Sequence, residues 1–360
     1  MRIEGAYAFQ LKAFGKPLEL FELPPLDPRP DEVVIQVIGC GICHTDVGFA
    51  YDGIPTRKAL PIILGHEICG RVVSAGENAS KLEGRLVIVP AVIPCGNCVA
   101  CRAGRPTICR NQFMPGNDGD GGFATHVRVP ARGLCAVPEP LPRGIHPALL
   151  SVIADAVTTP WEAIRRANVG PDDVTIFVGA GGIGGFGVQI ASSLGAAVVA
   201  VDIDQEKLDL ASKHGAGCVI KSENLDEKEV RTAVRNFAKE SGRQGIGLKI
   251  FEMSGTTAGQ QIAFSLLDFG GYLAVVGYTA KKVEIRLSNL MALDATARGN
   301  WGCPPDQYPA ALDLVLKGKI AVQPYVEEHS LENTPAVFEA VARKAIRRRV
   351  ILRPNGNGTV

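Results

Sequence analysis

Four cysteines within one short segment constrain the fold of this chain more than any other feature. Cys95, Cys98, Cys101 and Cys109 are separated by two, two and seven residues. This spacing lets four thiolates converge tetrahedrally on one zinc ion, which closes a lobe of the chain around the metal. Because the ligand set would be complete, the segment predicts a structural zinc site that does not contact substrate. A redox-active disulfide pair is the alternative interpretation of these cysteines.

A different set of potential metal ligands lies upstream. Cys43 and His66 suit a catalytic zinc, which needs about three protein ligands and one open position for water or a substrate oxygen. The third ligand should be remote in sequence. Asp155 meets this condition, and the apolar residues around it in the stretch 152–160 argue against an ordinary solvated aspartate. We therefore predict a catalytic zinc bound by Cys43, His66 and Asp155.

Two further acids lie close to these ligands in the sequence. Glu67 follows His66 and is either an occasional ligand that exchanges with water or an acid outside the ligand set that tunes the field at the metal. We favour the second role. Asp46 can accept a hydrogen bond from the other ring N–H of His66 and thereby fix its tautomer.

A glycine-rich turn directly follows the predicted strand 174–178 and leads into a helical stretch. The residues of this turn are Gly179, Ala180, Gly181, Gly182, Ile183 and Gly184. Gly179 allows the tight turn, Gly181 lets backbone amides approach a pyrophosphate, and Gly184 lets the helix pack closely on the strand. The context of strand, turn and helix favours a dinucleotide-binding turn over an ordinary strand-to-helix connection.

Asp202 ends the next predicted strand, eighteen positions after Gly184. A carboxylate at this position can accept hydrogen bonds from both hydroxyls of the adenosine ribose, and it repels the 2′-phosphate of NADP. The sequence therefore predicts NAD as the cofactor. A solvated turn residue is the alternative interpretation of Asp202.

Size and charge narrow the possible partners. A chain of 360 residues exceeds what one hydrophobic core usually organises, so two domains are expected. Thirty-eight basic and thirty-seven acidic residues leave a net charge of +1 without a basic face, which argues against a nucleic-acid partner. The first ten residues lack an apolar signal region, and no apolar run approaches the roughly 20 residues that span a bilayer. We expect a cytoplasmic protein without a membrane partner.

Composition changes along the chain. The first 150 residues or so are rich in valine, isoleucine, glycine and proline, with short apolar runs such as 33–38 and 85–90, which predict a mostly β module. From about Val174, short apolar strands alternate with helical stretches, which predicts a parallel, doubly wound sheet. The stretch 347–353 can return to the first module. The expected domains are 1–152 with 301–360, and 153–300.

In order and spacing, these motifs resemble the zinc-containing medium-chain dehydrogenase/reductase family of the alcohol dehydrogenase type, over essentially the whole chain. The resemblance implies an α/β protein with a GroES-like, mostly β catalytic domain and a Rossmann NAD-binding domain. It further implies one catalytic and one structural zinc ion per chain. A homotetramer is the expected assembly, with a dimer second.

The same resemblance assigns roles to single residues. It implies that the hydroxyl of Thr45 takes the proton of the substrate and that His44 faces the pyrophosphate of the cofactor. Lys207 is implied as a contact of the adenosine ribose, and Arg349 as the arginine that reaches a cofactor phosphate. One position departs from the pattern, because this chain has Gly48 where many relatives have the last histidine of a proton relay.

Five stretches resemble a narrower branch of the family, which oxidises a cyclic hydroxyacyl-CoA thioester in anaerobic benzoyl-CoA degradation. They are residues 43–53, 114–118, 154–160, 287–292 and 299–303. The resemblance implies a cyclic acyl-CoA substrate. The alternatives are a general NAD-dependent alcohol or polyol dehydrogenase and a non-catalytic protein that binds zinc and a nucleotide. The retained metal ligands and Thr45 favour an enzyme.

Overall fold

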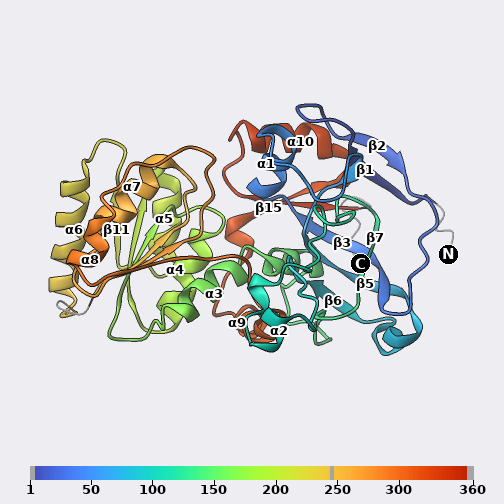
Figure 1. The fold of residues 1–360 in the computed structure, drawn as a ribbon, viewed down its shortest axis with the longest axis horizontal. Coiled ribbons are helices and arrows are strands. Elements are labelled where there is room, and N and C mark those ends of the chain that lie inside the picture. The colour runs from blue at the N-terminus through green and yellow to red at the C-terminus, as the bar shows by residue number, and fades with distance from the viewer. Residues whose placement is uncertain (1–4, 244–246, 355–360) are drawn as a thin grey trace. The chain divides into compact units, whose positions relative to one another are not determined.

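The computed structural model describes residues 5–243 and 247–354, which fall into two compact units. The first unit comprises Met1–Thr158, Gly302–Leu316 and Val326–Val360, and the second comprises Thr159–Trp301 and Lys317–Tyr325. The chain thus leaves the first unit for the second and later returns to it (Figure 1). None of the helices in the described ranges is both long and apolar enough to span a membrane.

The unit boundaries differ from the expected ones at residues 153–158, at Trp301, which belongs to the second unit, and at Lys317–Tyr325. Residues 153–158 belong to the first unit rather than to the nucleotide-binding segment, because the buried side chain of Tyr308 holds their backbone there. Lys317–Tyr325 belong to the second unit, because the side-chain amide of Gln189 both donates to and accepts from the backbone of Ala321. Neither contact has a signal in the sequence.

The first unit is built on two β-sheets. The larger sheet has the strand order β15-β16-β3-β5-β6-β8, with β7 also paired to β3, and the smaller has the order β2-β1-β4. The strands are β1 (Tyr7–Leu11), β2 (Glu19–Glu22), β3 (Glu32–Gly41), β4 (Ile62–Ile63), β5 (Glu67–Ala75), β6 (Leu86–Val89), β7 (His126–Pro130), β8 (Cys135–Ala136), β15 (Val326–Ser330) and β16 (Arg349–Arg353). Val33, Ile35 and Val37 alternate along β3 into the core, whereas Gln36 is exposed on the other face.

Short helices complete the first unit. They are α1 (His44–Tyr51), η1 (Glu77–Leu82), α2 (Val99–Arg102), η2 (Pro106–Ile108), η3 (Pro147–Ala154), η4 (Pro305–Gln307), α9 (Tyr308–Leu316), η6 (Leu331–Asn333) and α10 (Thr334–Ala342). The stretch 347–353 does return to this unit, because β16 pairs with β3 as well as with β15. This pairing brings the C-terminal strand beside the loop that carries Cys43.

The second unit contains a six-stranded parallel sheet in the order β11-β10-β9-β12-β13-β14. Its strands are β9 (Val174–Val178), β10 (Ala197–Asp202), β11 (Cys218–Lys221), β12 (Lys249–Glu252), β13 (Tyr272–Val275) and β14 (Thr296–Gly299). Its helices are α3 (Thr158–Arg166), which begins in the first unit, α4 (Gly184–Ser193), α5 (Gln205–Lys213), α6 (Glu227–Glu240), α7 (Thr257–Ser265), α8 (Ser288–Ala292) and η5 (Gln323–Tyr325). The order reverses between β9 and β12, and α4 packs with α5 while α6 packs with α7. The prediction of a doubly wound parallel sheet is confirmed.

Candidate functional site

Three residues that lie far apart in the sequence meet in the first unit. The Sγ atom of Cys43 lies 3.6 Å from Oδ2 of Asp155, and Nε2 of His66 lies 3.8 Å from the same oxygen. One potential ligand atom from each of these residues and from Glu67 lies within 4.8 Å of every other. Tetrahedral zinc holds its ligand atoms about 3.3 to 3.8 Å apart. The donor set and its spacing therefore fit a zinc ion.

Local backbone structure explains why Cys43 and His66 are held together. Cys43 is the N-cap of α1, and its backbone N–H donates to Oδ2 of Asp46 at 2.9 Å in a capping box. The other oxygen of Asp46 accepts from the backbone N–H of Gly65 at 3.1 Å and lies 3.2 Å from Nδ1 of His66. Asp46 is fully buried. It can hold the histidine with Nε2 directed at the cluster, as the sequence predicted.

Asp155 is positioned by a residue that the sequence did not reveal. It follows η3, and the carbonyl of Ala154 accepts a hydrogen bond from the hydroxyl of Tyr308 at 2.5 Å. The same hydroxyl accepts from the backbone N–H of Ala91 at 3.1 Å. Tyr308 is 1% exposed, so water cannot replace either bond. In the sequence, Tyr308 lies 153 residues after Asp155, in an apolar helical stretch. Nothing in that stretch indicates this role.

Arg349 is buried beside the same cluster. Its Nε donates to Oε2 of Glu67 at 3.1 Å, its Nη2 contacts Oε1 of Glu67, and Nη2 lies 3.5 Å from Oδ2 of Asp155. Gly41 is required here, since a Cβ at this position would lie 2.0 Å from Oε2 of Glu67. With its carboxylate bound by an arginine, Glu67 is better suited to tune the metal than to bind it. The role of Arg349 at a cofactor phosphate stays a prediction.

The charges of the cluster also suit a divalent cation. Burial opposes ionisation of Cys43, but Arg349 and His66 hold the pKa of its thiol below the ordinary value. Although burial disfavours a charged imidazole, Asp46 and Asp155 raise the pKa of His66 well above its usual range. The thiolate of Cys43 and the carboxylates of Asp46, Glu67 and Asp155 outnumber the cations Arg349 and His66, which leaves the site with excess negative charge that a zinc ion would balance.

His44 and Thr45 are the first two residues of α1 and directly follow the potential ligand Cys43. The hydroxyl oxygen of Thr45 lies 3.5 Å from Sγ of Cys43, which is compatible with its predicted part in proton transfer, whereas His44 is exposed. Gly48 lies one turn further on. A Cβ at this position would lie 2.8 Å from Cδ1 of Ile54, so a histidine there would have to displace that side chain. The roles of Thr45 and His44 stay predictions.

The four clustered cysteines form a second potential metal site in the first unit. The separations of their Sγ atoms are 3.9 Å for Cys95 and Cys101, 3.5 Å for Cys98 and Cys101, 3.7 Å for Cys98 and Cys109, and 3.5 Å for Cys95 and Cys109. Four thiolates on one zinc ion lie about 3.8 Å apart. The backbone N–H of Asn97 lowers the pKa of Cys95 to about 6, whereas desolvation and the neighbouring thiol of Cys98 raise the pKa of Cys101, so a bound cation is needed to hold all four as thiolates. The arrangement fits a four-coordinate zinc better than two separate pairs.

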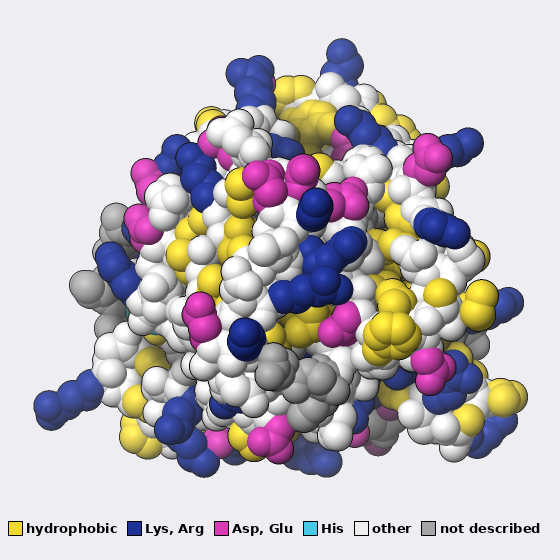
Figure 2. All heavy atoms as spheres, turned by 90° about the vertical axis from the view of Figure 1, so that its left-hand side faces the viewer, with side chains coloured by type: hydrophobic (Ala, Val, Ile, Leu, Met, Phe, Trp, Pro, Cys, Tyr) yellow, Lys and Arg dark blue, Asp and Glu magenta, His cyan; other side chains and the backbone are white. Residues whose placement is uncertain are grey.

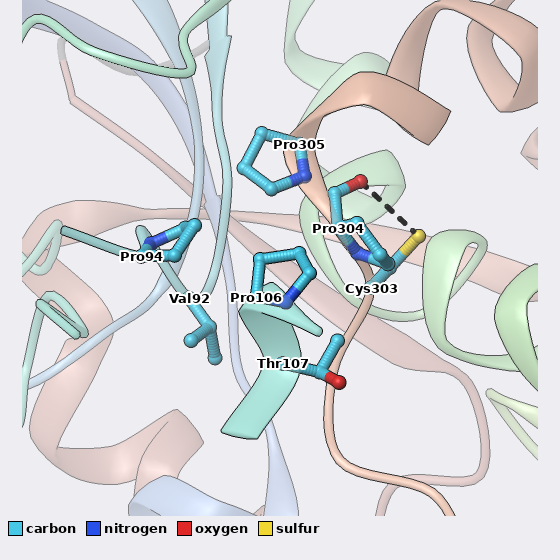
Figure 3. A pocket seen from close by; sticks show the side chains of 7 residues that line it. All are labelled: Val92, Pro94, Pro106, Thr107, Cys303, Pro304 and Pro305. Carbon is cyan, nitrogen blue, oxygen red and sulfur yellow. Dashed lines mark hydrogen bonds between the residues drawn. The ribbon is translucent and has the colours of Figure 1, made fainter. Parts of the chain in front are cut away.

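This cysteine lobe contacts the segment that returns from the second unit. Figure 3 shows Pro106 and Thr107, which precede Cys109, beside Cys303, Pro304 and Pro305. That segment continues directly into α9, which carries the tyrosine bonded next to Asp155. The lobe therefore packs beside the segment that leads to Tyr308, and among the described residues its four cysteines form a group separate from that of Cys43, His66 and Asp155.

The glycine turn in the second unit has little room for side chains. Gly179 has φ +96°, and a Cβ there would lie 2.6 Å from the backbone nitrogen of Ser254. A Cβ at Gly184 would lie 1.7 Å from the carbonyl oxygen of Gly179. At Gly181 the nearest neighbour of such an atom among the described residues is Nζ of Lys207, at 3.8 Å. The first and last glycines are therefore fixed by the fold, and the middle one leaves space for a ligand.

Asp202 and Lys207 lie beside this turn. Oδ2 of Asp202 accepts from the backbone N–H of Ala180 at 2.7 Å, and Oδ1 accepts from Asp204 at 3.0 Å. Ile183, at the N-cap of α4, provides no side-chain cap, so the first amides of the helix can bind a pyrophosphate together with the glycine turn, which includes Gly182. These residues fit NAD, and their contacts with it stay predictions.

His146 predicts a pH dependence of stability. Its Nδ1 accepts from the backbone N–H of Ala148 at the start of η3, and its Nε2 lies 3.4 Å from Arg353, which is paired with Glu328. Burial, and then Arg353, lower the pKa of His146. Because the unfolded chain takes up the proton more readily, the stabilisation present above about pH 6.5 should decrease as the pH falls below that value.

The expected result is a smaller loss of unfolding temperature between pH 7.5 and 5.5 in His146→Asn, which keeps a capping acceptor that does not titrate. Differential scanning fluorimetry of both proteins at both pH values measures it. The same loss in both would show that His146 does not contribute.

Two family descriptions match the chain. The alcohol dehydrogenase GroES-like domain matches residues 29–139, and the zinc-binding dehydrogenase family matches residues 182–317. The first match contains the cysteine lobe and His66, and the second begins inside the glycine turn. Together they bear out the predicted GroES-like and Rossmann-like architecture.

Individual relatives match over nearly the whole chain. An alcohol dehydrogenase of Rhizobium meliloti (strain 1021) is 31% identical over 348 residues, 96% of this chain and 98% of the relative. One from Geobacillus stearothermophilus is 30% identical over 342 residues, 94% of this chain and 96% of the relative. The solved structure of the alcohol dehydrogenase from the archaeon Aeropyrum pernix has a TM-score of 0.86 and 29% identity, covering 97% of this chain and 100% of that one.

Proposed function

Because the chain belongs to the zinc-dependent medium-chain alcohol dehydrogenase family, we propose that it oxidises 6-hydroxycyclohex-1-ene-1-carbonyl-CoA to 6-oxocyclohex-1-ene-1-carbonyl-CoA with NAD. The observation that carries the dehydrogenase activity is the convergence of Cys43, His66 and Asp155 next to Thr45. Anaerobic benzoyl-CoA degradation would supply such a substrate. The protein would act in the cytoplasm.

The chemistry divides between bound groups and the chain. When bound, zinc polarises the substrate oxygen and NAD accepts the hydride. Cys43, His66 and Asp155 would hold the metal, and the hydroxyl of Thr45 would accept the proton of the substrate hydroxyl through a hydrogen bond. Asp46 keeps the ring of His66 in place.

One of the stretches that resemble the acyl-CoA branch packs beside the metal ligands, which motivates the narrower substrate class. The turn Met114–Asp118 belongs to the stretches that resemble the acyl-CoA branch, and a Cβ on its Gly116 would lie 2.8 Å from the backbone nitrogen of Gly65, next to His66. The side chain of Asn117 in this turn accepts from the backbone N–H of Arg57 at 3.0 Å. A stretch particular to this branch is thus built into the surroundings of the metal ligands.

Kinetics with matched substrates test the proposal. NADH formation from 6-hydroxycyclohex-1-ene-1-carbonyl-CoA should exceed that from cyclohexanol, short primary alcohols and polyols by at least about a hundredfold in kcat/KM, which corresponds to roughly 2.7 kcal/mol of transition-state binding. The free acid without CoA separates recognition of the ring from recognition of the nucleotide. Equal efficiency with short alcohols would instead establish a general alcohol or polyol dehydrogenase, the function that the names of the relatives favour.

Replacing Asp202 tests the choice of NAD over NADP. Asp202→Ala should lower kcat/KM for NAD by about 10- to 100-fold, the effect of losing a hydrogen bond to a charged group, and should narrow the preference for NAD over NADP. Asp202→Asn is the matched control, because its amide oxygen can still accept from Ala180. The Asp202→Asn variant should no longer repel the 2′-phosphate of NADP, but it should keep the hydrogen bond that holds the glycine turn. An unchanged cofactor ratio in both variants would contradict the assignment.

Copies of the chain would associate through the open edge of the parallel sheet. All four residues of β14 are exposed, and β14 pairs only with β13 within the described residues. Nearby, Leu287 is 67% exposed and Met291 79%, and a mostly apolar groove of about 140 Å³ is lined by Ile285, Leu287 and Ala297 of β14 among others. Figure 2 faces the side on which Figure 1 places α6 and α8, and apolar side chains reach its surface between charged ones. An unpaired edge with apolar flanks suits pairing with a second copy.

The mass of the assembly in solution tests this face. We expect a tetramer, with a dimer as the smaller alternative, and Leu287→Glu should shift it to smaller species in mass photometry. Phe14→Glu, which places the same charge on an exposed aromatic position of the first unit, should not. An unchanged mass for Leu287→Glu would exclude this face.

A further inference from the structure

We propose that Glu252 is a positioning residue for the nicotinamide half of the cofactor, because its side chain holds the loop that follows β12, and this loop packs against both the glycine turn and the loop that follows β13. The inference rests on the proposed use of NAD. Glu252 lies outside every motif described above, and it is 1% exposed.

Its place in the sheet gives the first argument. Glu252 is the last residue of β12 and pairs in register with Val178, the residue before Gly179, and with Val275 in β13. The strand order reverses between β9 and β12, so this is the crevice where a doubly wound sheet binds a dinucleotide. Asp202 on β10 marks the adenosine side of the crevice. The loops after β12 and β13 therefore lie on the nicotinamide side.

Hydrogen bonds make Glu252 the centre of these loops. Its Oε1 accepts from the backbone N–H of Ser254 at 2.8 Å, from the hydroxyl of Ser254 at 2.6 Å, and from the backbone N–H of Gly255 at 3.0 Å. Its backbone carbonyl accepts from Val276 and Gly277, which follow β13. One residue thus fixes the direction in which both loops leave the sheet.

Close packing also prevents the loops after β12 and β13 from shifting independently of the glycine turn. A Cβ on Gly179 would lie 2.6 Å from the nitrogen of Ser254, and one on Gly277 would lie 2.3 Å from the nitrogen of Gly255. Backbone therefore packs directly on backbone from the glycine turn through the loop after β12 to the loop after β13. Moving Ser254 would move a wall of the crevice, because close-packed backbone cannot absorb the change.

The second carboxylate oxygen of Glu252 is less well satisfied than the first, although the side chain of Gln260 also favours the charged carboxylate. Oε2 is buried without a hydrogen-bond partner among the described residues, and a Cβ on Gly277 would lie 2.7 Å from it. Burial, opposed by the hydrogen bonds from Ser254 and Gly255, raises the pKa of Glu252. A half-satisfied buried carboxylate costs stability, and such costs concentrate at functional sites.

Binding of NAD⁺ and of ADP-ribose, which lacks the nicotinamide, tests the inference by calorimetry. In Glu252→Ala the Kd of NAD⁺ should rise about tenfold or more, the effect of losing charge-assisted hydrogen bonds, while that of ADP-ribose should change less than about twofold. Glu252→Gln retains an acceptor at Oε1 and should restore most of the NAD⁺ affinity. Equal weakening of both ligands, or unchanged NAD⁺ binding, would overturn the inference.

A matched control separates positioning from stability. Asp173 is a buried carboxylate of the same unit that accepts from Gly170 and Lys249 just before β9, at the opposite end of the parallel strands from Glu252. Asp173→Asn should lower the unfolding temperature without changing the ratio of the two Kd values. If Glu252→Ala does not fold, Ser254→Ala is compared with wild type for the same ratio, and an unchanged ratio would overturn the inference. Wild-type protein that binds neither ligand would instead refute the proposed use of NAD.

Discussion

Asp155→Ala is expected to leave one zinc ion per chain instead of two and to lower kcat/KM by about a thousandfold, or roughly 4 kcal/mol of transition-state stabilisation. Without the carboxylate, Cys43 and His66 remain as ligands, with Glu67 bound to Arg349. Two ligands do not hold catalytic zinc firmly. Inductively coupled plasma mass spectrometry on gel-filtered protein measures the metal, and NADH formation measures turnover.

Asp155→Cys is the matched control for this variant. A thiolate can take the place of the carboxylate as the third zinc ligand. This variant should keep two zinc ions and a substantial part of the activity. Asp155→Ala protein that keeps two zinc ions with unchanged turnover would show that the catalytic ligand set is wrong.

Gly184→Ala is expected to have the largest effect on the nucleotide site. The added Cβ would lie 1.7 Å from the carbonyl oxygen of Gly179, so the turn or the start of α4 must move. Forcing a methyl group into such a contact costs about 1–3 kcal/mol or more. We expect a lower unfolding temperature of the cofactor-free protein and a Kd for NAD⁺ that rises at least about a hundredfold, since the displaced amides no longer face the pyrophosphate.

Gly181→Ala provides the comparison. Its Cβ would have only Nζ of Lys207 nearby, at 3.8 Å, so the cofactor-free protein should unfold at the wild-type temperature. NAD⁺ binding should still weaken, because the methyl group would occupy the space in which the pyrophosphate approaches the backbone. Fluorimetry without ligand and calorimetry with NAD⁺ separate the two effects. Equal unfolding temperatures for Gly184→Ala and wild type would contradict the steric argument.

The sequence predicted those parts of the molecule that depend on local pattern. The strand Val174–Val178 has the predicted bounds, because an apolar run is a local property of the sequence. The cysteine spacing predicted a lobe whose sulfur atoms do converge. Cys43, His66 and Asp155 could be proposed as partners because few residue types bind zinc.

The parts that the sequence did not predict depend on contacts between distant residues. Tyr308 is an ordinary helix residue in the sequence, and only the fold brings its hydroxyl to the backbone beside Asp155. Arg349 was assigned to a phosphate from a resemblance alone, whereas the pairing of β16 with β3 places it against Glu67. Glu252 ends a strand whose sequence is typical of a buried strand. Nothing in the sequence indicates that its side chain accepts hydrogen bonds from the loop that follows.

Anomalous diffraction at the zinc edge, from crystals grown with NAD, tests the central claim most directly. The account predicts two zinc peaks per chain, one among the four cysteines and one within about 2.0 to 2.3 Å of Sγ of Cys43, Nε2 of His66 and a carboxylate oxygen of Asp155. The nicotinamide ring should face the second peak. A single peak at the cysteine lobe in active protein, or a second ion bound elsewhere, would contradict it.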